Sequence, residues 1–390
     1  MRENAPVRVL LTSPGLIGHI HPLVPLATAL LARGNDVRWA TGPDGCERVR
    51  RAGFDALPVG ITQAERWKQF TRRHPEIAEL PPQERPNVMF GKLFGEVSAP
   101  PALDDLLAIV SSWRPELVVN DAAELASPIA AAAIGVPHVT HAFGALLPEA
   151  RVRRAADDVA WLWRAQGLEP RPYAGLYDHL YLDIYPPSLQ ASAGDHLGAR
   201  RLLRPVAFAG AAQEGVGADI AGRTGRPLVY LTFGTFVDTG EAFRAALAGI
   251  RDTGVGLVAT VGPDGDPAAF GPQPSRVVVE RYIPQTQLLG VCDLVVSHGG
   301  SGTVLAALAL GIPQLCLPQA ADQFLNAAAV ARAGAGLAIA AEQVDAASVA
   351  DASRRLLGDE RFAVGARRVA AEIAAMPSPE AVASALETPP

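Results

Sequence analysis

The chain has 390 residues, which is more than one hydrophobic core usually serves, so we expect two domains. Hydrophobic residues make up 49% of the chain, charged residues make up 19%, and the formal net charge is −6. This acidic balance argues against nucleic acid as a partner, because binding a phosphate backbone needs a basic surface.

Short β-branched runs alternate with longer alanine- and leucine-rich runs in the first half of the chain. This alternation is typical of a parallel sheet covered by helices. Strands are expected at 7–12, 36–41, 117–120 and 138–142. Helices are expected between them, at 22–33, 44–52, 102–113 and 126–134.

The second half of the chain repeats the alternation. Strands are expected at 228–233, 256–261, 277–280, 294–297 and 314–317. Helices are expected at 241–251, 284–289, 303–310 and 323–333. The fold class is therefore α/β, with two Rossmann-like domains. Open sheets of this kind bind ligands at the carboxyl ends of their strands, so we expect the two domains to face each other across a cleft.

Residues 209–227 are rich in glycine and alanine and poor in large apolar side chains, which is typical of a linker. The expected domains are therefore 1–208 and 228–390. The last helix is a candidate to pack back on the first domain.

A glycine-rich junction, SHGGSGT, connects an expected strand to an expected helix. Free N–H groups and the positive helix end favour an anion there, and the glycines let the backbone approach it closely. Ser301 and Thr303 add hydroxyl donors, and the side chain of His298 can reach the same anion. A phosphate or diphosphate is the expected ligand. Neither a Walker A lysine nor a GxGxxG fingerprint is present, which disfavours a nicotinamide cofactor.

Asp322 and Gln323 follow the next strand, directly before an expected helix. A carboxylate and an amide at this edge suit hydrogen bonds to vicinal hydroxyls. The alternative for Asp322 is a helix N-cap.

The array HGGSGT…GIPQ…P…DQFLNA resembles the donor-binding signature of nucleotide-diphosphosugar-dependent glycosyltransferases with two Rossmann-like domains, the GT-B fold. The segment GHIHPLVPLATALLARGNDV resembles the Gly-His-x-x-Pro opening of that family, and ERYIPQTQLL resembles its base-recognition segment. YAGLYDHLYLDIYPPSLQ is similar to bacterial enzymes that attach deoxysugars to polyketide-type natural products in antibiotic biosynthesis. The resemblance covers nearly the whole chain and keeps the order of the motifs. It implies an acceptor-binding first domain and a donor-binding second domain.

The resemblance also implies roles for individual residues. Two glycine-containing turns would hold the diphosphate through Thr232, Gly234, Thr235, His298, Gly300, Ser301, Gly302 and Thr303. Tyr282 and Ile283 would flank the base, and Asp322 and Gln323 would bind sugar hydroxyls.

Ala306 departs from the family pattern. In many UDP-sugar enzymes of this family, a glutamate eight positions after the motif histidine binds the ribose hydroxyls. The missing carboxylate fits a 2′-deoxyribose, so the expected co-substrate is a dTDP-sugar in preference to a UDP-sugar.

The Gly-His-x-x-Pro register favours His19 over its neighbour His21 as the general base that deprotonates the acceptor hydroxyl. Asp121 ends a strand at the position of the aspartate in the family's dyad and would orient His19, with Glu124 as the reserve partner. The alternative for Asp121 is a helix N-cap. We expect direct, inverting displacement, with the diphosphate stabilised by the second domain.

The acceptor is expected to be an apolar or aromatic aglycone. Candidate residues for its pocket are His138, His141, Trp161 and Tyr173, and core packing is the alternative for each. No metal and no cofactor are expected. The three cysteines are widely spaced, as in a reducing cytoplasm, and no stretch reaches the roughly 18 apolar residues of a membrane span. The sequence leaves a homodimer open.

Two other functions fit parts of this pattern. A sugar-nucleotide epimerase shares the fold but needs no apolar acceptor site, so the Trp/Tyr-rich segment 161–185 counts against it. A non-catalytic nucleotide-sugar-binding partner would not need to keep His19, Asp121 and His298 together.

Overall fold

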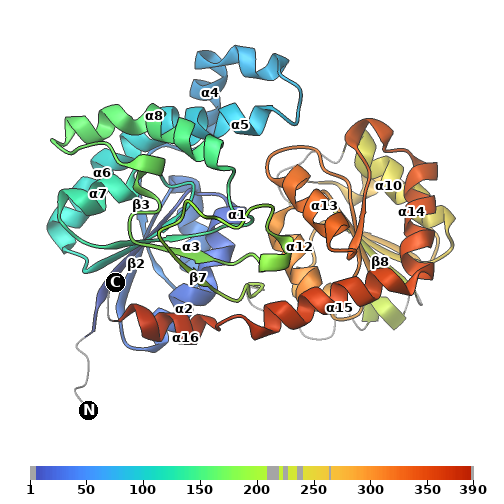
Figure 1. Ribbon diagram of the computed structural model, residues 1–390. Coiled ribbons are helices and arrows are strands. Elements are labelled where there is room, and N and C mark those ends of the chain that lie inside the picture. Colours follow the sequence, from blue (N-terminus) through green and yellow to red (C-terminus); the bar gives the residue numbers. More distant parts are fainter. Residues whose placement is uncertain (1–5, 209–218, 223–226, 235–239, 263–264, 388–390) are drawn as a thin grey trace. The chain divides into compact units, whose positions relative to one another are not determined.

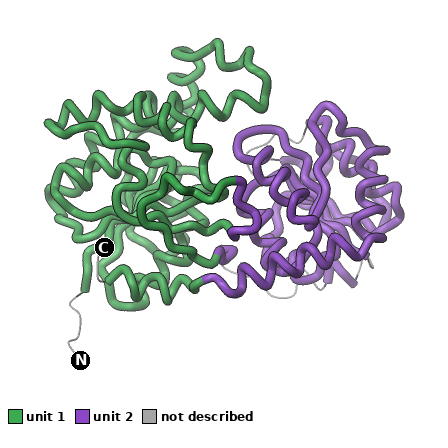
Figure 2. The backbone as a smooth tube through the Cα atoms, viewed as in Figure 1, with its two compact units in different colours: residues 1–185, 192–204, 377–390 green, residues 186–191, 205–376 purple. Residues whose placement is uncertain are grey.

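The computed structural model describes residues 6–208, 219–222, 227–234, 240–262 and 265–387. The chain divides into two compact units (Figure 2). Unit 1 comprises residues 1–185, 192–204 and 377–390, and unit 2 comprises residues 186–191 and 205–376. Compared with the expected domains, residues 186–191 and 205–208 belong to unit 2, and residues 377–390 belong to unit 1. Most of the expected linker, 209–218 and 223–226, lies outside the described residues.

Unit 1 is built on a seven-stranded sheet in the order β3-β2-β1-β4-β5-β6-β7, in which every neighbouring pair is parallel. Its strands are β1 (Arg8–Ser13), β2 (Asp36–Thr41), β3 (Asp55–Pro58), β4 (Leu117–Asp121), β5 (His138–His141), β6 (Leu180–Asp183) and β7 (Ala199–Leu202). The four expected strands are confirmed. The sequence did not predict β3, β6 and β7, because these four-residue strands have no long β-branched run to mark them.

Helices cover both faces of this sheet (Figure 1). They are α1 (Ile17–Ile20), α2 (Val24–Ala32), α3 (Cys46–Arg51), α4 (Gln63–Arg73), α5 (Arg85–Phe90), α6 (Ala99–Trp113), α7 (Ser127–Ala133), α8 (Glu149–Ala165) and α16 (Pro379–Leu386). A π-helical stretch, η4 (Gly91–Ser98), joins α5 to α6.

Unit 2 has a six-stranded parallel sheet in the order β10-β9-β8-β11-β12-β13. Its strands are β8 (Leu228–Thr232), β9 (Gly256–Thr260), β10 (Val277–Glu280), β11 (Leu294–Ser297), β12 (Gln314–Cys316) and β13 (Gly336–Ala338). Its helices are α10 (Glu241–Asp252), α11 (Gln285–Leu289), α12 (Ser301–Ala309), α13 (Gln323–Arg332), α14 (Ala346–Gly358) and α15 (Glu360–Ala375). The five expected strands are confirmed. Apolar clusters on both sides of the sheet explain why its strands read as continuous hydrophobic runs.

In each sheet, the strands before one point follow one another toward one edge, and the strands after it follow one another toward the opposite edge. This change in strand order lies between β1 and β4 in unit 1 and between β8 and β11 in unit 2. At such a point, the loops after the two central strands diverge and leave room for a ligand. The loops after β1 and β4 carry His19 and Glu124, and those after β8 and β11 carry Gly234 and His298. The topology therefore positions one candidate site in each unit.

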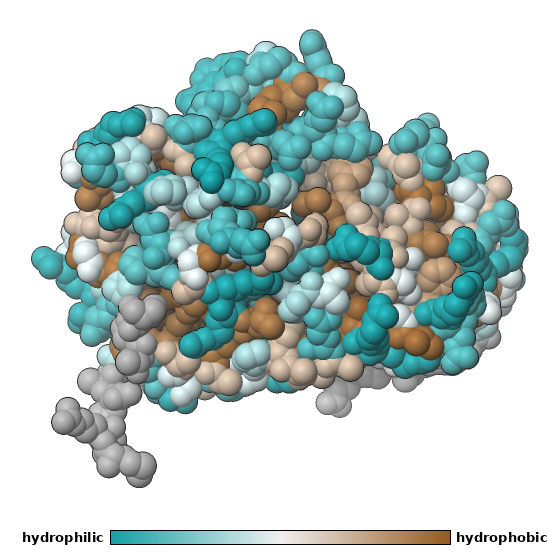
Figure 3. All heavy atoms as spheres, in the orientation of Figure 1, coloured by the Kyte–Doolittle hydropathy of each residue, from teal (hydrophilic) through white to brown (hydrophobic). Residues whose placement is uncertain are grey.

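No helix in the described part of the chain is long and apolar enough to cross a membrane. On the face shown in Figure 3, hydrophilic and hydrophobic side chains are interspersed.

The last helix, α16, packs against α2 within unit 1. Val382 and Leu386 are each 1% exposed, and the guanidinium of Arg33 donates to both carboxylate oxygens of Glu387 at 2.6 Å. The end of the chain thus supplies part of the core of the first unit.

Truncating Leu386 should therefore destabilise unit 1. We expect Leu386→Ala to lower the free energy of unfolding by about 2–5 kcal/mol, because it leaves a cavity beside α2. Urea denaturation would measure this. Val364→Ala, at an exposed position of α15, is the matched control and should change little. A loss for Leu386→Ala as small as the control's would contradict this account of α16.

Candidate active site

The structure brings His19 and Asp121 together at the carboxyl edge of the sheet in unit 1. Nδ1 of His19 lies 2.9 Å from Oδ1 of Asp121, which also accepts a hydrogen bond from the N–H of Ala123 at 2.7 Å. Asp121 is fully buried at the end of β4, and His19 belongs to α1, which follows the adjacent β1. The N-cap of α7 is Ala126, so Asp121 is not the helix cap that was its alternative. A carboxylate that accepts from Nδ1 leaves Nε2 of His19 to take up a proton.

Two phenylalanines frame the His19 ring. The ring centroids of Phe143 and Phe94 lie 4.5 Å and 5.7 Å from that of His19. The sequence analysis missed both residues. Phe143 follows the end of β5, so the rule that functional residues cluster after strand ends could have found it. Phe94 lies in η4, and no sequence signal placed that stretch beside His19.

The reserve orienting partner Glu124 and the rival base His21 are placed differently from the dyad residues. Glu124 is buried, and its Oε1 accepts from the N–H of Ala126 at 3.1 Å rather than from His19. Burial, reinforced by the charge of Asp121, raises the pKa of Glu124 to about 7. Burial and the nearby Arg48 lower the pKa of His21 to about 4.

The expected acceptor-pocket histidines lie at opposite ends of β5. His141 pairs in register with Asp121, is fully buried and lies with Nδ1 2.6 Å from the carbonyl oxygen of Ala142. Burial lowers its pKa to about 4. His138 pairs with Val118 at the amino end of the sheet. The placement of His138 beside the dyad is therefore wrong, because the two histidines are separated by the length of the strand.

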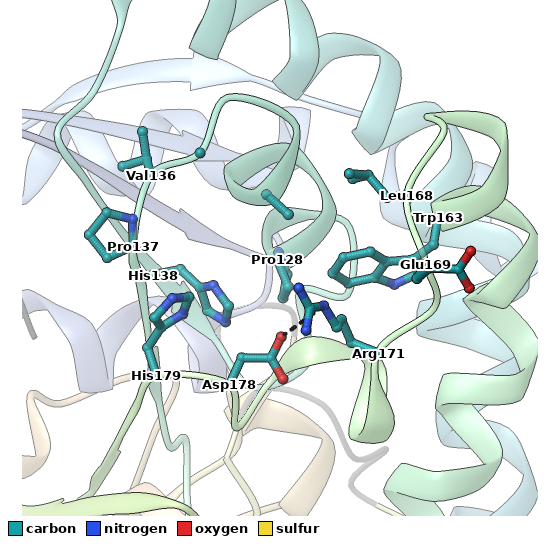
Figure 4. A pocket seen from close by; sticks show the side chains of 12 residues that line it. Pro128, Val136, Pro137, His138, Trp163, Leu168, Glu169, Arg171, Asp178 and His179 are labelled. Carbon is teal, nitrogen blue, oxygen red and sulfur yellow. Dashed lines mark ion pairs between the residues drawn. The ribbon is translucent and has the colours of Figure 1, made fainter.

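His138 instead lines a cavity of about 430 Å³ at the amino end of β5. In Figure 4 its imidazole lies beside that of His179, and a dashed line marks the ion pair between Arg171 and Asp178, which also line the cavity. Nε2 of His138 is 2.8 Å from the carbonyl oxygen of Gly175. This cavity is remote from His19 within the sheet, so it is no part of the candidate active site.

Trp161 and Tyr173 do not gather around the dyad in a pocket. Trp161 is 52% exposed on α8. The hydroxyl of Tyr173 donates to Glu149 and accepts from Arg153, both at 2.8 Å, and forms a surface network. Core packing, the alternative given for Trp161, does not fit its exposure, and the expectation that these two side chains line an acceptor pocket stays a prediction. The segment they belong to packs as helix and turn.

In unit 2, two glycines hold the imidazole of His298. A Cβ atom added to Gly300 would lie 2.6 Å from Nε2 of His298, and one added to Gly234 would lie 2.9 Å from its Cε1. Gly234 also has a φ of 71°, a conformation that glycine adopts most readily. Burial lowers the pKa of His298 to about 4, against the opposing charge of Asp322. The ring is therefore neutral at neutral pH.

A second network joins the glycine junction to the loop after β12. The hydroxyl of Ser301 donates to Oδ2 of Asp322 at 2.7 Å, and Nδ2 of Asn326 donates to the same oxygen at 2.9 Å. Asp322 precedes α13 but makes no side-chain cap bond within the described residues, so its carboxylate points to α12. Asn326 is another residue that the sequence analysis missed. Its place one turn after Asp322 was the available signal.

The other residues expected to bind the nucleotide-sugar differ in which of their groups are available for binding. Oε1 of Gln323 accepts from the N–H groups of Gln319 and Ala320, at 2.8 Å and 3.0 Å, which leaves its amide N–H₂ as the donor. The Thr232 hydroxyl accepts from the N–H of Gly234 at 3.2 Å. Tyr282 is 59% exposed, whereas the side chain of Ile283 is buried in the core, so only the backbone of Ile283 could flank a base.

The remaining donor residues lie at the start of α12, except Thr235, which lies outside the described residues. A Cβ atom added to Gly302 would meet nothing within 4 Å in the described part of the chain, so space is open above it. The same described part holds no group of three or more His, Cys, Asp or Glu placed to bind a metal ion.

The raised pKa of Glu124 predicts a pH effect on stability. Its folded value of about 7 exceeds its usual 4.5, so its contribution is present below the unfolded pKa and is lost as pH rises through 7. The free energy of unfolding should fall over this range by up to about 3 kcal/mol. Glu124→Gln should flatten that slope in urea denaturation at several pH values. Glu84→Gln, which removes an exposed carboxyl, is the control, and an unchanged slope in Glu124→Gln would refute the assignment.

The comparisons with known proteins agree with this geometry. Residues 28–213 and 255–388 match the N-terminal and C-terminal domains of the erythromycin biosynthesis protein CIII-like family. The chain is 34% identical to the elloramycin glycosyltransferase ElmGT of Streptomyces olivaceus, over 98% of this chain and 97% of that one. It is also 34% identical to an L-demethylnoviosyl transferase of Streptomyces niveus, over 97% of each.

Among solved structures, the spinosyn rhamnosyltransferase SpnG superposes with a TM-score of 0.82 at 30% identity, covering 98% of this chain and all of that one. SpnG has also been solved with thymidine diphosphate and with spinosyn aglycone, each at a TM-score of 0.78 and 29% identity. The chain therefore belongs to the erythromycin biosynthesis protein CIII-like family, and it is a GT-B glycosyltransferase of the antibiotic deoxysugar type.

Proposed function

We propose that this glycosyltransferase moves a deoxysugar from a dTDP-sugar to a hydroxyl of a natural-product aglycone, with inversion at the anomeric carbon. The observation that carries the proposal is the buried Asp121 carboxylate held 2.9 Å from Nδ1 of His19 at the switch point of the sheet in unit 1.

In the proposed reaction, Nε2 of His19 accepts the proton of the acceptor hydroxyl while its oxygen forms a bond to the anomeric carbon. The bond between that carbon and the diphosphate oxygen breaks, and dTDP leaves with the electron pair. Attack on the face opposite to the leaving group inverts the configuration. Asp121 holds the Nδ1–H and stabilises the imidazolium that forms.

The diphosphate would bind at the start of α12. The free N–H groups of the first turn and the positive end of this nine-residue helix favour an anion, and the open space above Gly302 lets it approach. His298 would donate a hydrogen bond from the pocket between its two glycines. The sugar hydroxyls would be bound by the amide N–H₂ of Gln323 and by Asp322, which the donors Ser301 and Asn326 orient.

Two observations favour a thymidine donor over a uridine donor. Ala306 occupies the position of the ribose-binding glutamate of many UDP-sugar enzymes, and it is 7% exposed. SpnG, which this chain resembles over 98% of its length, was solved with thymidine diphosphate. We propose that a carboxylate is absent at 306 because a 2′-deoxyribose offers it no second hydroxyl.

The epimerase alternative is less favoured, because it gives the His19–Asp121 pair in the other unit no acceptor to deprotonate. A non-catalytic partner protein would bind the donor but release no dTDP, so turnover distinguishes it. We also propose that no metal ion is needed, since protein groups supply the charge stabilisation of the leaving diphosphate.

Calorimetric titration tests the donor site. We expect dTDP to bind more tightly than UDP, and His298→Ala to weaken dTDP binding about tenfold or more through the loss of a charge-assisted hydrogen bond. His179→Ala, which removes an exposed histidine of unit 1, should bind dTDP like the parent chain. A strong preference for UDP would refute the thymidine assignment. Binding of neither diphosphate would remove the donor site altogether.

Turnover tests the base. With a panel of dTDP-deoxysugars and aromatic or macrolide aglycones, His19→Ala should lower the rate of dTDP release about 10²–10⁴-fold while leaving dTDP affinity unchanged. Asp121→Asn should lower the same rate, because the orienting carboxylate is lost. Near-native turnover by His19→Ala would refute the assignment of the base.

A further inference from the structure

Unit 1 contains a buried arginine that no described group neutralises by contact. Arg66 lies on α4, one helical turn before the core residue Phe70, so the inward face of the helix carries the guanidinium into the protein. Arg66 is 6% exposed, and its Nε is fully buried. The guanidinium makes no hydrogen bond and no ion pair with any described residue. Its carbon Cζ lies 5.8 Å from the ring centroid of Phe94.

An unpaired buried charge is expensive, because it loses its hydration without a compensating hydrogen bond. This loss of hydration lowers the pKa of Arg66, and the charge of Glu124 offsets only part of that decrease. Glu124 is itself 7% exposed, and the one hydrogen bond that its carboxyl group makes to a described residue comes from the backbone N–H of Ala126. The side chains of Arg66 and Glu124 thus interact through charge, without a hydrogen bond or an ion-pair contact between them. This arrangement fits a ligand group that would bind between them.

A small cavity beside the pair is lined by residues that adjoin the dyad in sequence or contact it. Arg66 and Glu124 both line a space of about 20 Å³, which is room for one water-sized polar group. Three of the other lining residues adjoin the catalytic candidates. Gly15 precedes the helix of His19, Ala123 follows Asp121, and Phe94 contacts the His19 ring.

We propose that Arg66 and Glu124 form a specificity site for a carbonyl or enolate oxygen on the ring system that carries the glycosylated hydroxyl. The proposal rests on the proposed function, since it assumes that the acceptor lies against His19. The guanidinium N–H groups would donate to this oxygen. The raised pKa of Glu124 lets it hold a proton near neutral pH and act as a second donor.

Such a site would select strongly against acceptors without the oxygen. A binding site built to hydrogen-bond a polar group rejects the analogue lacking it, because its own buried groups then stay unpaired. An apolar wall would discriminate far less between two acceptors that differ by one oxygen.

Two probes that differ by this single oxygen test the proposal on the full chain. Titration would compare 6-hydroxy-1-tetralone with 5,6,7,8-tetrahydro-2-naphthol, which lacks the carbonyl. We expect the ketone to bind about tenfold more tightly, and Arg66→Gln to reduce that ratio to about one. Arg72→Gln, which removes an exposed arginine of the same helix, should keep the ratio. Equal affinity for both probes in the parent chain, or no binding of the ketone, would overturn the proposal.

Thermal stability provides a second test, because a binding role and a structural role of Arg66 predict opposite changes in Tm. Replacing an unpaired buried charge with an apolar side chain of similar length should leave the Tm of Arg66→Met unchanged or higher, while the selectivity for the ketone is lost. A lower Tm with retained selectivity would show that Arg66 only supports the fold. If dTDP binds and His19→Ala lowers turnover, but the parent chain binds the ketone and the naphthol equally well, only this inference fails and the proposed function stands. If dTDP does not bind, the proposed function fails first.

Discussion

Parallel pairing of β1 with β4 and of β8 with β11 is the constraint on which the candidate site depends. A parallel sheet brings the carboxyl ends of all its strands to one edge, and the reversal in strand order at these two pairs separates the loops that follow. Residues more than a hundred positions apart, His19 and Asp121, meet at that edge because their strands are neighbours. The same rule explains why His138, at the other end of β5, does not join them.

Burial at the carboxyl end of each sheet also sets the charge of the polar groups there. His298 and His141 are neutral because desolvation disfavours their protonated forms, whereas the carboxyl of Glu124 is pushed toward protonation for the same reason. In unit 1, the carboxyl end of the sheet therefore carries both a group close to a change in protonation, Glu124, and a group held in its neutral form, His141. A leaving diphosphate and an acceptor hydroxyl both need partners that can respond to new charge.

The glycines of the donor motif are explained by specific close contacts and a positive φ rather than by a general need for flexibility. Gly300 has an ordinary backbone conformation, and its missing Cβ makes room for the ring of His298. Gly234 combines this close approach with a positive φ. Ala321, also with a positive φ of 56°, places Asp322 after a strained residue. Strain of this kind commonly marks loops whose geometry is set by a ligand site.

The sequence by itself determined the α/β alternation, the two-domain organisation and the residues of the two motifs, because hydrophobic periodicity and glycine–histidine spacing are local properties of the chain. It also identified His19 and Asp121 as candidates for one site. Only the tertiary structure decided which side chains surround them. Phe94 and Arg66 come to line one small cavity through helix packing that no local pattern encodes. Strand direction excluded His138, since residues of one short strand look alike in sequence but lie at opposite edges of the sheet.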